Sequence, residues 1–515
     1  MRRSIAAVVV AVSAALSVVP TGAATATDGS TTPSGSATSP LAQQQAGQAL
    51  DRARAVLSGA AGTTTGSRVE GTLAMRDLFA AYPALTTTQR TEARRVLARP
   101  TDGTNDPYGD GYTVSAKRKC VGHFCIHWVP TTSDAPPSKA WVDTTLTTMN
   151  QVWRKEVGTL NYRRPIKDGH HGGSSKFDVY LKDVGADYLY GYCAPEYVKA
   201  GHPREASGYC VLDNDFASSQ YGGAKPVNSL RVTAAHEFFH AVQFAYDYKE
   251  DPWLMEATAT WMEERFADAI NDNRQYLPYG QVRRPATSLD VYNQQGFNQY
   301  GNWPFFEYLS SRYGNHVVRA IWNGAGEFPG GGKKYSTEAV AGALRKHGGF
   351  KAIFARYASA NTAPARSYAE GSAWPSAKID QRWTLSQDNR HGSATLTIKH
   401  MAARDAVLKP DTSLKGNRWR GRIVVDGPRR AKSPAVDVLI TRTNGKVVSK
   451  SVRLTRTGDG NISFPFSSGG VKKVTVTVAN ASTRFDCHHK TSFSCRGKPL
   501  DNAETFQLKV SAFKG

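Results

Sequence analysis

The chain is poor in acidic residues and in cysteine, and it has almost no long apolar run. Its 515 residues include 43 Asp and Glu against 65 Lys and Arg, so the formal net charge is +22 at pH 7. Only six cysteines are present, which excludes a small domain built on disulfides. After the N-terminal leader no stretch is long and apolar enough to cross a bilayer, which argues against an integral membrane protein.

The chain does have enough apolar material for more than one folded unit. Apolar residues make up 40% of the sequence and aromatic residues 10%. The length exceeds that of one ordinary domain, so we expect two folded domains preceded by a leader.

The N-terminus has the features of a secretory signal peptide. Two arginines precede an apolar run over residues 5–19, and small residues at 22–26 form cleavage patterns. We therefore expect residues 1–26 to be a signal peptide and the mature protein to be secreted, with no membrane span. Residues 27–48 are rich in Thr, Ser, Ala, Gly and Gln and are predicted to be a disordered linker.

Helical patterns follow near residues 49–58 and 70–98, so residues 49–110 are predicted to form a helical N-terminal segment. Such a block in front of the core of an exported protein is either a pro-segment or the first layer of the next domain.

The excess of positive charge points to an anionic partner. Six cations gather late in the chain, at Arg418, Arg420, Arg422, Arg429, Arg430 and Lys432. For an exported protein the partners to expect are cell-wall polymers, lipid head groups or acidic substrates, which long-range attraction brings to the surface. Nucleic acid is not expected, because no nucleic-acid-binding motif is present. Solubility alone explains the charge equally well.

The cysteines fall into three close pairs: Cys120 with Cys125, Cys193 with Cys210, and Cys487 with Cys495. In an exported chain this spacing predicts three disulfides. Two of the pairs have histidines beside them that also suit a structural zinc site: His123, His127, His488 and His489. An oxidising compartment favours the disulfides.

The strongest chemical signal is an H-E-x-x-H motif at residues 236–240. On a helix, His236 and His240 lie one turn apart on the same face, so their two imidazoles can bind one metal ion. Glu237 is then placed to act as general base toward a water on that metal. Small and apolar residues surround the motif, as a buried helix requires.

A catalytic zinc site needs a third protein ligand and an open position for water. Metzincins take this ligand from an extension of the motif, but the Gly and His positions of that extension are Gln243 and Tyr246 here. A second amphipathic run follows and places Glu256 16 residues after the second histidine, far enough for the chain to turn and return. Glu256 is the predicted third ligand, and Glu263, two turns later on the same face, is the alternative.

The segments H-E-F-F-H-A-V-Q-F and W-L-M-E-A-T-A-T-W-M-E-E resemble those of bacterial secreted zinc metallopeptidases of gluzincin type. Further similarities lie at residues 72–79, 97–103, 124–128, 177–185 and 300–309. The resemblance implies a zincin-like core that holds Zn²⁺ through His236, His240 and Glu256, with Glu237 as base.

One position departs from that family. Thermolysin-like gluzincins have Asp four residues after the ligand Glu, where it orients a histidine, and this chain has Thr260. The groups that orient the ligands must therefore come from elsewhere. For the donor that stabilises an oxyanion, Tyr246, Tyr292 and Tyr300 are the candidates, and Tyr300 is our choice.

Periodicity predicts an α+β core over residues 111–377. Strands are expected near residues 124–129, 176–182 and 208–212, and helices near 141–160, 233–247, 253–267 and 300–313. Asn228 or Ser229 is the expected N-cap of the motif helix. Asp213 and Asp215, after the third strand, suit either a calcium site or a capped turn.

From residue 378 the chain changes to short alternating runs separated by turn signals such as Asn444-Gly445. The runs lie at residues 394–398, 422–425, 436–441, 447–454, 471–478 and 505–510. They predict a β-sandwich over residues 378–515 with an accessory role.

These features predict a secreted zinc-dependent endopeptidase that hydrolyses a protein or peptide substrate. Two other functions remain open. The first alternative is a catalytically weak or inactive relative that binds the cell wall or another anionic surface. The second is a zinc hydrolase that acts on non-peptide amides such as wall cross-links.

Overall fold

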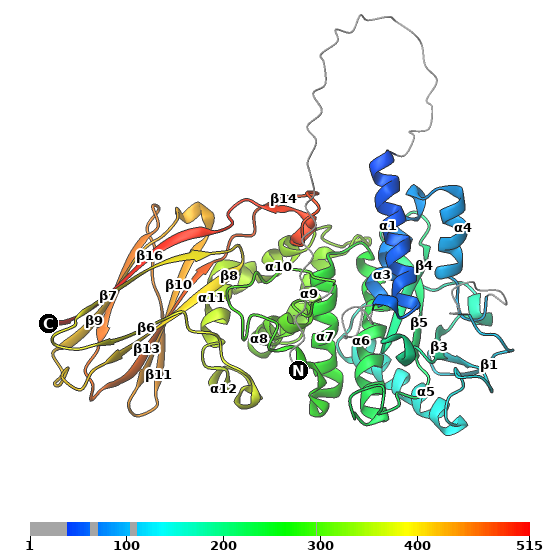
Figure 1. Ribbon diagram of the computed structural model, residues 1–515, viewed down its shortest axis with the longest axis horizontal. Coiled ribbons are helices and arrows are strands. Elements are labelled where there is room, and N and C mark those ends of the chain that lie inside the picture. Colours follow the sequence, from blue (N-terminus) through cyan, green and yellow to red (C-terminus); the bar gives the residue numbers. More distant parts are fainter. Residues whose placement is uncertain (1–38, 62–70, 103–110, 295) are drawn as a thin grey trace, which may run out of the picture.

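The computed structural model describes residues 39–61, 71–102, 111–294 and 296–515. Helices and strands are both abundant, which confirms the α+β class (Figure 1). A mixed sheet with its helices lies at one end of the molecule, a group of helices in the middle, and two further sheets at the other end. The expected signal peptide and the first part of the expected linker lie outside the described residues.

The first sheet has five strands in the order β1-β2-β3-β5-β4. They are β1 (Lys117–Val121), β2 (Phe124–Trp128), β3 (Phe177–Lys182), β4 (Gly191–Val198) and β5 (Ala206–Asp213). Strands β2, β3 and β5 run parallel, while β1 and β4 are antiparallel edges. Side chains of β5 alternate between two hydrophobic clusters, one on each face of the sheet, so the strand is buried along its whole length.

Helix α6 (Pro226–Asp247) lies on one face of this sheet beside α5 (Lys139–Trp153), and α7 (Pro252–Ala267) packs against α6. Both α6 and α7 begin with proline. At the first position of a helix a backbone N–H has no partner within the helix, so a proline there removes no hydrogen bond. Lys225 is therefore the N-cap of α6. The expected caps, Asn228 and Ser229, lie inside the helix instead.

The other face of the sheet carries α1 (Pro40–Leu57), α3 (Gly71–Ala81) and α4 (Thr87–Val96). Helix α1 begins inside residues 27–48, so the expected linker is wrong over its last nine positions. Ser39 accepts a hydrogen bond from Ala42 N, and Ala46 is buried against the neighbouring helices. The composition of residues 40–48 did not indicate a helix, because they contain few large apolar side chains. Alanine is sufficient here, since it lets the helix pack closely against its neighbours.

Arg99, just after α4, is 1% exposed and ties these helices to the sheet. Its guanidinium donates to Asp178 and to both oxygens of Glu196, each at 2.7 Å, and also to Asp168. Asp178 in turn bonds His127 of β2 at 2.7 Å. One cation thus pairs with three carboxylates that are largely buried.

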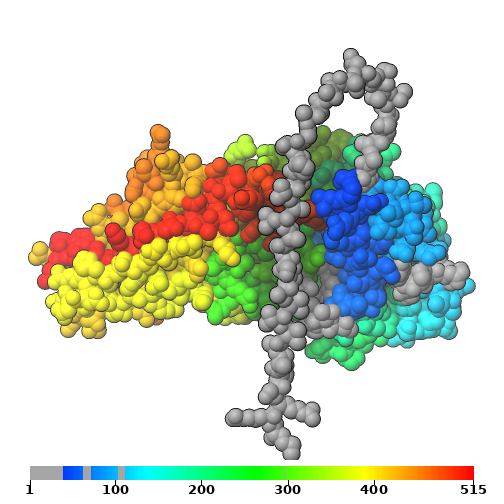
Figure 2. Space-filling view, turned by 45° about the horizontal axis from the view of Figure 1, so that its top comes forward, coloured from blue at the N-terminus to red at the C-terminus, as the bar shows by residue number. Residues whose placement is uncertain are grey.

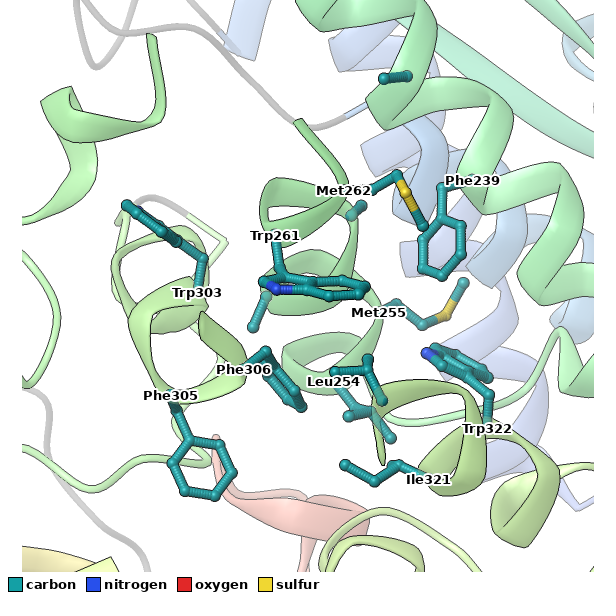
Figure 3. Close-up of a cluster of buried hydrophobic side chains, with 14 of the residues drawn as sticks. Phe239, Leu254, Met255, Trp261, Met262, Trp303, Phe305, Phe306, Ile321 and Trp322 are labelled. Carbon is teal, nitrogen blue, oxygen red and sulfur yellow. The ribbon is translucent and has the colours of Figure 1, made fainter. Parts of the chain in front are cut away.

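The helical middle of the molecule surrounds α7. It contains α8 (Trp303–Tyr313), α9 (His316–Ala325), α10 (Thr337–Leu344), α11 (Phe350–Ala360) and α12 (Pro364–Ser367). Figure 3 shows Trp261 of α7 between Phe239 of α6 and Trp303 of α8, with Trp322 of α9 nearby. The indole N–H of Trp322 donates to Thr258 at 3.2 Å. This packing fixes α7 on several sides, although α7 carries many polar residues.

The C-terminal part contains two sheets. One has the order β11-β10-β13-β8-β6 and the other β12-β9-β16-β7. The strands are β6 (Gln381–Leu385), β7 (His391–Ile398), β8 (Ala402–Pro410), β9 (Trp419–Asp426), β10 (Pro434–Arg442), β11 (Val447–Ser451), β12 (Asp459–Pro465), β13 (Val471–Asn480) and β16 (Glu504–Lys514). Side chains from both sheets form one hydrophobic cluster, so the two sheets share a core.

The three expected disulfides, Cys120–Cys125, Cys193–Cys210 and Cys487–Cys495, are confirmed. The last one closes a loop between β14 (Phe485–Asp486) and β15 (Lys498–Pro499) that returns to the helical middle (Figure 2). In this loop Cys495 N donates to Asp251 at 2.8 Å, directly before α7. Within the described residues, none of the helices is long and apolar enough to cross a membrane.

Replacing Arg99 by Met should destabilise the protein by about 3–5 kcal/mol, because Asp168, Asp178 and Glu196 would lose their shared cation while still buried. Thermal and urea unfolding of the mature protein measure this change. Arg95→Met, at an exposed position on α4, is the matched control and should leave stability close to wild type. Equal effects of the two substitutions would contradict the role of Arg99.

Asp405 of β8 predicts a pH-dependent loss of stability. Burial raises its pKa to about 8, although the hydrogen bond from Thr477 lowers the pKa. The folded state therefore binds more protons than the unfolded state between the ordinary Asp pKa and about pH 8, so stability falls as pH rises through that window.

Asp405→Asn keeps the acceptor for Thr477 and removes the ionisation. Relative to this variant, the wild type should lose up to about 1.4 kcal/mol per pH unit between pH 5 and 8. Denaturation at several pH values measures the difference, with exposed Asp388→Asn as control. Parallel pH curves for wild type and Asp405→Asn would show that the carboxyl does not contribute.

Candidate metal centre

Helices α6 and α7 bring two imidazoles and one carboxylate together. His236 and His240 lie one turn apart on α6, and Glu256 is the fifth residue of α7. The Nε2 atom of His236 is 3.3 Å from one Glu256 oxygen, and Nε2 of His240 is 3.6 Å from the other. One ligand atom from each residue lies within 4.8 Å of the others, which is the spacing that one ion can bridge.

The three side chains fit a metal ion better than they fit one another. His240 and Glu256 are 0% exposed. His240 Nε2 and both Glu256 oxygens have no hydrogen-bond partner of ordinary geometry. Buried polar atoms without a partner are costly, so their convergence on one point calls for a group that binds all of them. Two nitrogens and a carboxylate are a ligand set that suits Zn²⁺.

The other nitrogen of each ring is held by a neighbour. His236 Nδ1 is 2.7 Å from Glu263 Oε1, and His240 Nδ1 is 2.7 Å from Gln243 Oε1. The amide of Gln243 is itself fixed, because its N–H groups donate to Met255 O and Thr258 Oγ1. A proton between Nδ1 and each acceptor leaves both Nε2 atoms directed at Glu256.

Protonation of the two rings differs because their surroundings differ. Burial lowers the pKa of His240 well below its ordinary value, and the positive charge of His236 lowers it further. For His236 burial also lowers the pKa, but Glu256 and Glu263 outweigh this effect and raise it. His240 is therefore a neutral imidazole with its Nε2 lone pair available for a ligand bond.

The motif glutamate is positioned from the N-terminal helices. Thr72 of α3 donates to Glu237 Oε2 at 2.8 Å and accepts from Cys193 N of β4 at 2.8 Å. The Cys193 sulfur lies 2.9 Å from the Glu237 carbonyl oxygen, so the Cys193–Cys210 disulfide packs directly against the motif helix. Removing residues 49–110 as a pro-segment would take away the hydroxyl that orients Glu237.

A pocket of about 610 Å³, including its open side, reaches one of the three side chains, His236. His236, Glu237 and Tyr300 line it, together with Gly191 at the start of edge strand β4. The Tyr300 ring centroid is 6.1 Å from that of His236. Burial raises the pKa of Glu256, while His236 and, to a smaller extent, the Tyr300 hydroxyl lower it.

The structure places the other candidates outside this group of ligands. Glu263, our alternative third ligand, contacts the back of His236 instead. The Tyr246 hydroxyl accepts from Arg163 N, and neither Tyr246 nor Tyr292 lines this pocket in the described part of the chain. Thr260 donates to the Glu256 carbonyl, within its own helix, and does not orient a histidine.

Sequence reasoning missed Gln243 and Thr72. The role of Gln243 could have been predicted, since a polar residue three positions after His240 lies on the same helix face and can bond its ring. Thr72 had none, because it is 165 positions from Glu237 in the chain. The aspartates at 213 and 215 accept backbone N–H bonds from Phe216 and Ala217, as a capped turn does.

No family model and no curated protein matches the chain. Among solved structures, the chain is similar to a family GH115 4-O-methyl-α-glucuronidase with specificity for decorated arabinogalactans. The alignment has 8% identity and a TM-score of 0.14, and it covers 56% of this chain and 38% of that one. A likeness at this level carries no argument, so the function has to be inferred from the site.

Loss of either ring partner should weaken zinc binding by about 10–100-fold, because the imidazole is then no longer held toward Glu256. The variants are Gln243→Ala and Glu263→Ala, and competition with a chelating dye measures their zinc affinity. Thr260→Ala is the control from the same helix pair and should bind zinc like the wild type. If Thr260→Ala weakens binding as much as the other two, local packing rather than ring orientation is responsible.

Proposed function

We propose that the protein is a secreted zinc-dependent endopeptidase of gluzincin type, with a zincin-like core and a C-terminal β-sandwich. The observation that supports this most strongly is the convergence of His236 Nε2, His240 Nε2 and the Glu256 carboxylate beside a pocket that His236 and Glu237 line. Three disulfides and the N-terminal sequence support export.

The roles of the protein side chains follow from their places. Zn²⁺ bound at this point supplies a Lewis acid that polarises a carbonyl and lowers the pKa of water. Glu237 lines the same pocket, beside His236, and accepts a proton from the attacking water and returns it to the leaving amine nitrogen. Tyr300 is placed to donate its hydroxyl to the oxygen on which negative charge develops.

An extended peptide suits the wall of the pocket. Strand β4 is at the edge of the sheet, and its first residue, Gly191, lines the pocket. Edge strands bind extended chains through main-chain hydrogen bonds, which need no particular side chain in the substrate. Thr72 already binds Cys193 N, so a substrate on this edge would meet Gly191, the residue of β4 that lines the pocket.

Of the two alternatives, an inactive surface-binding relative has two arguments in its favour: the absence of Asp at position 260 and the basic character of the C-terminal part. Glu263 and Gln243 now hold the two rings, which removes the first argument. Hydrolysis of non-peptide amides uses the same chemistry. A panel of casein, short peptides and wall cross-link amides, with and without chelator, separates the two kinds of hydrolase.

Glu237→Gln should retain zinc and lose casein hydrolysis by about 10²–10⁴-fold, since the amide cannot take the proton of water. Zinc content and cleavage rate are measured on the same sample. Glu338→Gln, in the first turn of α10, is the matched control and should keep full activity. Unchanged cleavage by Glu237→Gln would remove Glu237 from the mechanism, and absence of cleavage in the wild type with zinc bound would favour the inactive alternative.

A further inference from the structure

A second concave site lies where the helical middle meets the five-stranded C-terminal sheet. Its volume is about 1330 Å³, including its open side. The floor is the outer face of strands β6, β8, β10 and β13, and the wall is the segment around residues 376–379 together with Arg283. Lys378 N donates to Arg283 O, so the two parts of the wall are joined.

This groove is lined by six cations and by no carboxylate. The cations are Arg283, Lys378, Arg382, Lys409, Lys472 and Lys473. Within the described residues none of them forms an ion pair, whereas neighbouring Arg404, outside the groove, pairs with Asp380 at 2.6 Å. A cleft lined by charges of one sign concentrates its electric field and attracts ions of the opposite sign.

The cations converge because of the strand register. Arg382 lies opposite Val407, Val407 opposite Thr475, and Lys473 opposite Thr441, so these side chains share the face away from the hydrophobic core. Burial lowers the pKa of Lys473, and the nearby charges of Lys409, Lys472 and Arg382 lower it further. Such mutual repulsion is a cost that a bound anion would relieve.

The outer face of the five-stranded C-terminal sheet is covered by a helix at one end and open at the other. At one end α11 packs on β10 and β13, where Ala435 and Ala479 are buried beneath it (Figure 1). Further along, Thr477 bonds Asp405 within the sheet. Beyond that point come Lys409 and Lys473, and the helix no longer covers them, so the cationic end is left open as the groove.

We propose that this groove binds a linear polyanion that carries phosphate groups. Six cations line the groove, more than one small anion would contact at once, which favours a polymer segment over a single ion. Four of the six cations are lysines, which bind phosphate as point charges, and the two arginines can bind phosphate through their fork. None of the described residues that line the groove is aromatic, so this lining offers no ring on which bases of single-stranded nucleic acid could stack. This binding does not depend on the metal centre.

The test is isothermal titration of the intact zinc-loaded protein with inorganic polyphosphate, at low salt and with added NaCl. The groove variant is Arg382→Glu/Lys473→Glu. The control, Arg453→Glu/Lys509→Glu, makes the same charge change at two exposed positions outside the groove. Polyglutamate and single-stranded DNA are titrated in parallel, and casein hydrolysis and thermal unfolding report that each variant is folded.

The proposal predicts that the groove variant binds polyphosphate at least about tenfold more weakly than the wild type, with a smaller salt dependence, while the control stays near the wild type. If the groove variant unfolds, Arg382→Gln/Lys473→Gln replaces it and should show a smaller loss in the same direction. If the groove and control variants lose the same polyphosphate affinity, the effect comes from net charge alone and the groove is not the binding site. Tighter binding of polyglutamate or DNA than of polyphosphate would overturn the assignment of the ligand.

Discussion

The candidate site depends on one contact between two helices, the approach of Glu256 on α7 to the imidazoles of His236 and His240 on α6. Neither helix could hold this arrangement alone, since an isolated pair of histidines has no third ligand and a lone buried carboxylate has no counter-charge. Pro252 starts α7 soon after α6 ends at Asp247, so the turn between them sets the position of Glu256. The aromatic packing around Trp261 and Trp322 then holds α7 in place.

Distant parts of the chain also secure this helix pair. Thr72 comes from the N-terminal helices and bonds Glu237, while Asp251, the N-cap of α7, accepts from Cys495 near the C-terminus. Both ends of the chain thus contact the two helices that carry the ligands. The candidate metal centre therefore depends on the whole fold and not on the motif alone, which explains why α6 and α7 tolerate so many buried polar side chains.

The sequence was most informative where one local pattern decides the outcome. The H-E-x-x-H spacing fixes two residues on one helix face, and Glu256 followed from the length needed to turn back. The disulfides followed from proximity in the chain. Strands β6, β8 and β12 were missed because β6 and β12 are short and largely exposed and β8 carries a buried Asp405, which breaks the alternation. Hydrophobic periodicity could not predict the contacts of Thr72, Gln243 and Glu263, because they depend on side-chain geometry or on residues far apart in the chain.

The central claim is that one zinc ion is bound by two imidazoles and one carboxylate. X-ray absorption at the zinc edge of the purified mature protein tests it most directly. The account predicts one zinc per chain with nitrogen and oxygen neighbours at about 2.0–2.2 Å, two of them imidazoles, and loss of the imidazole signal in His236→Ala/His240→Ala. Sulfur neighbours, or a spectrum that this double substitution does not change, would contradict it.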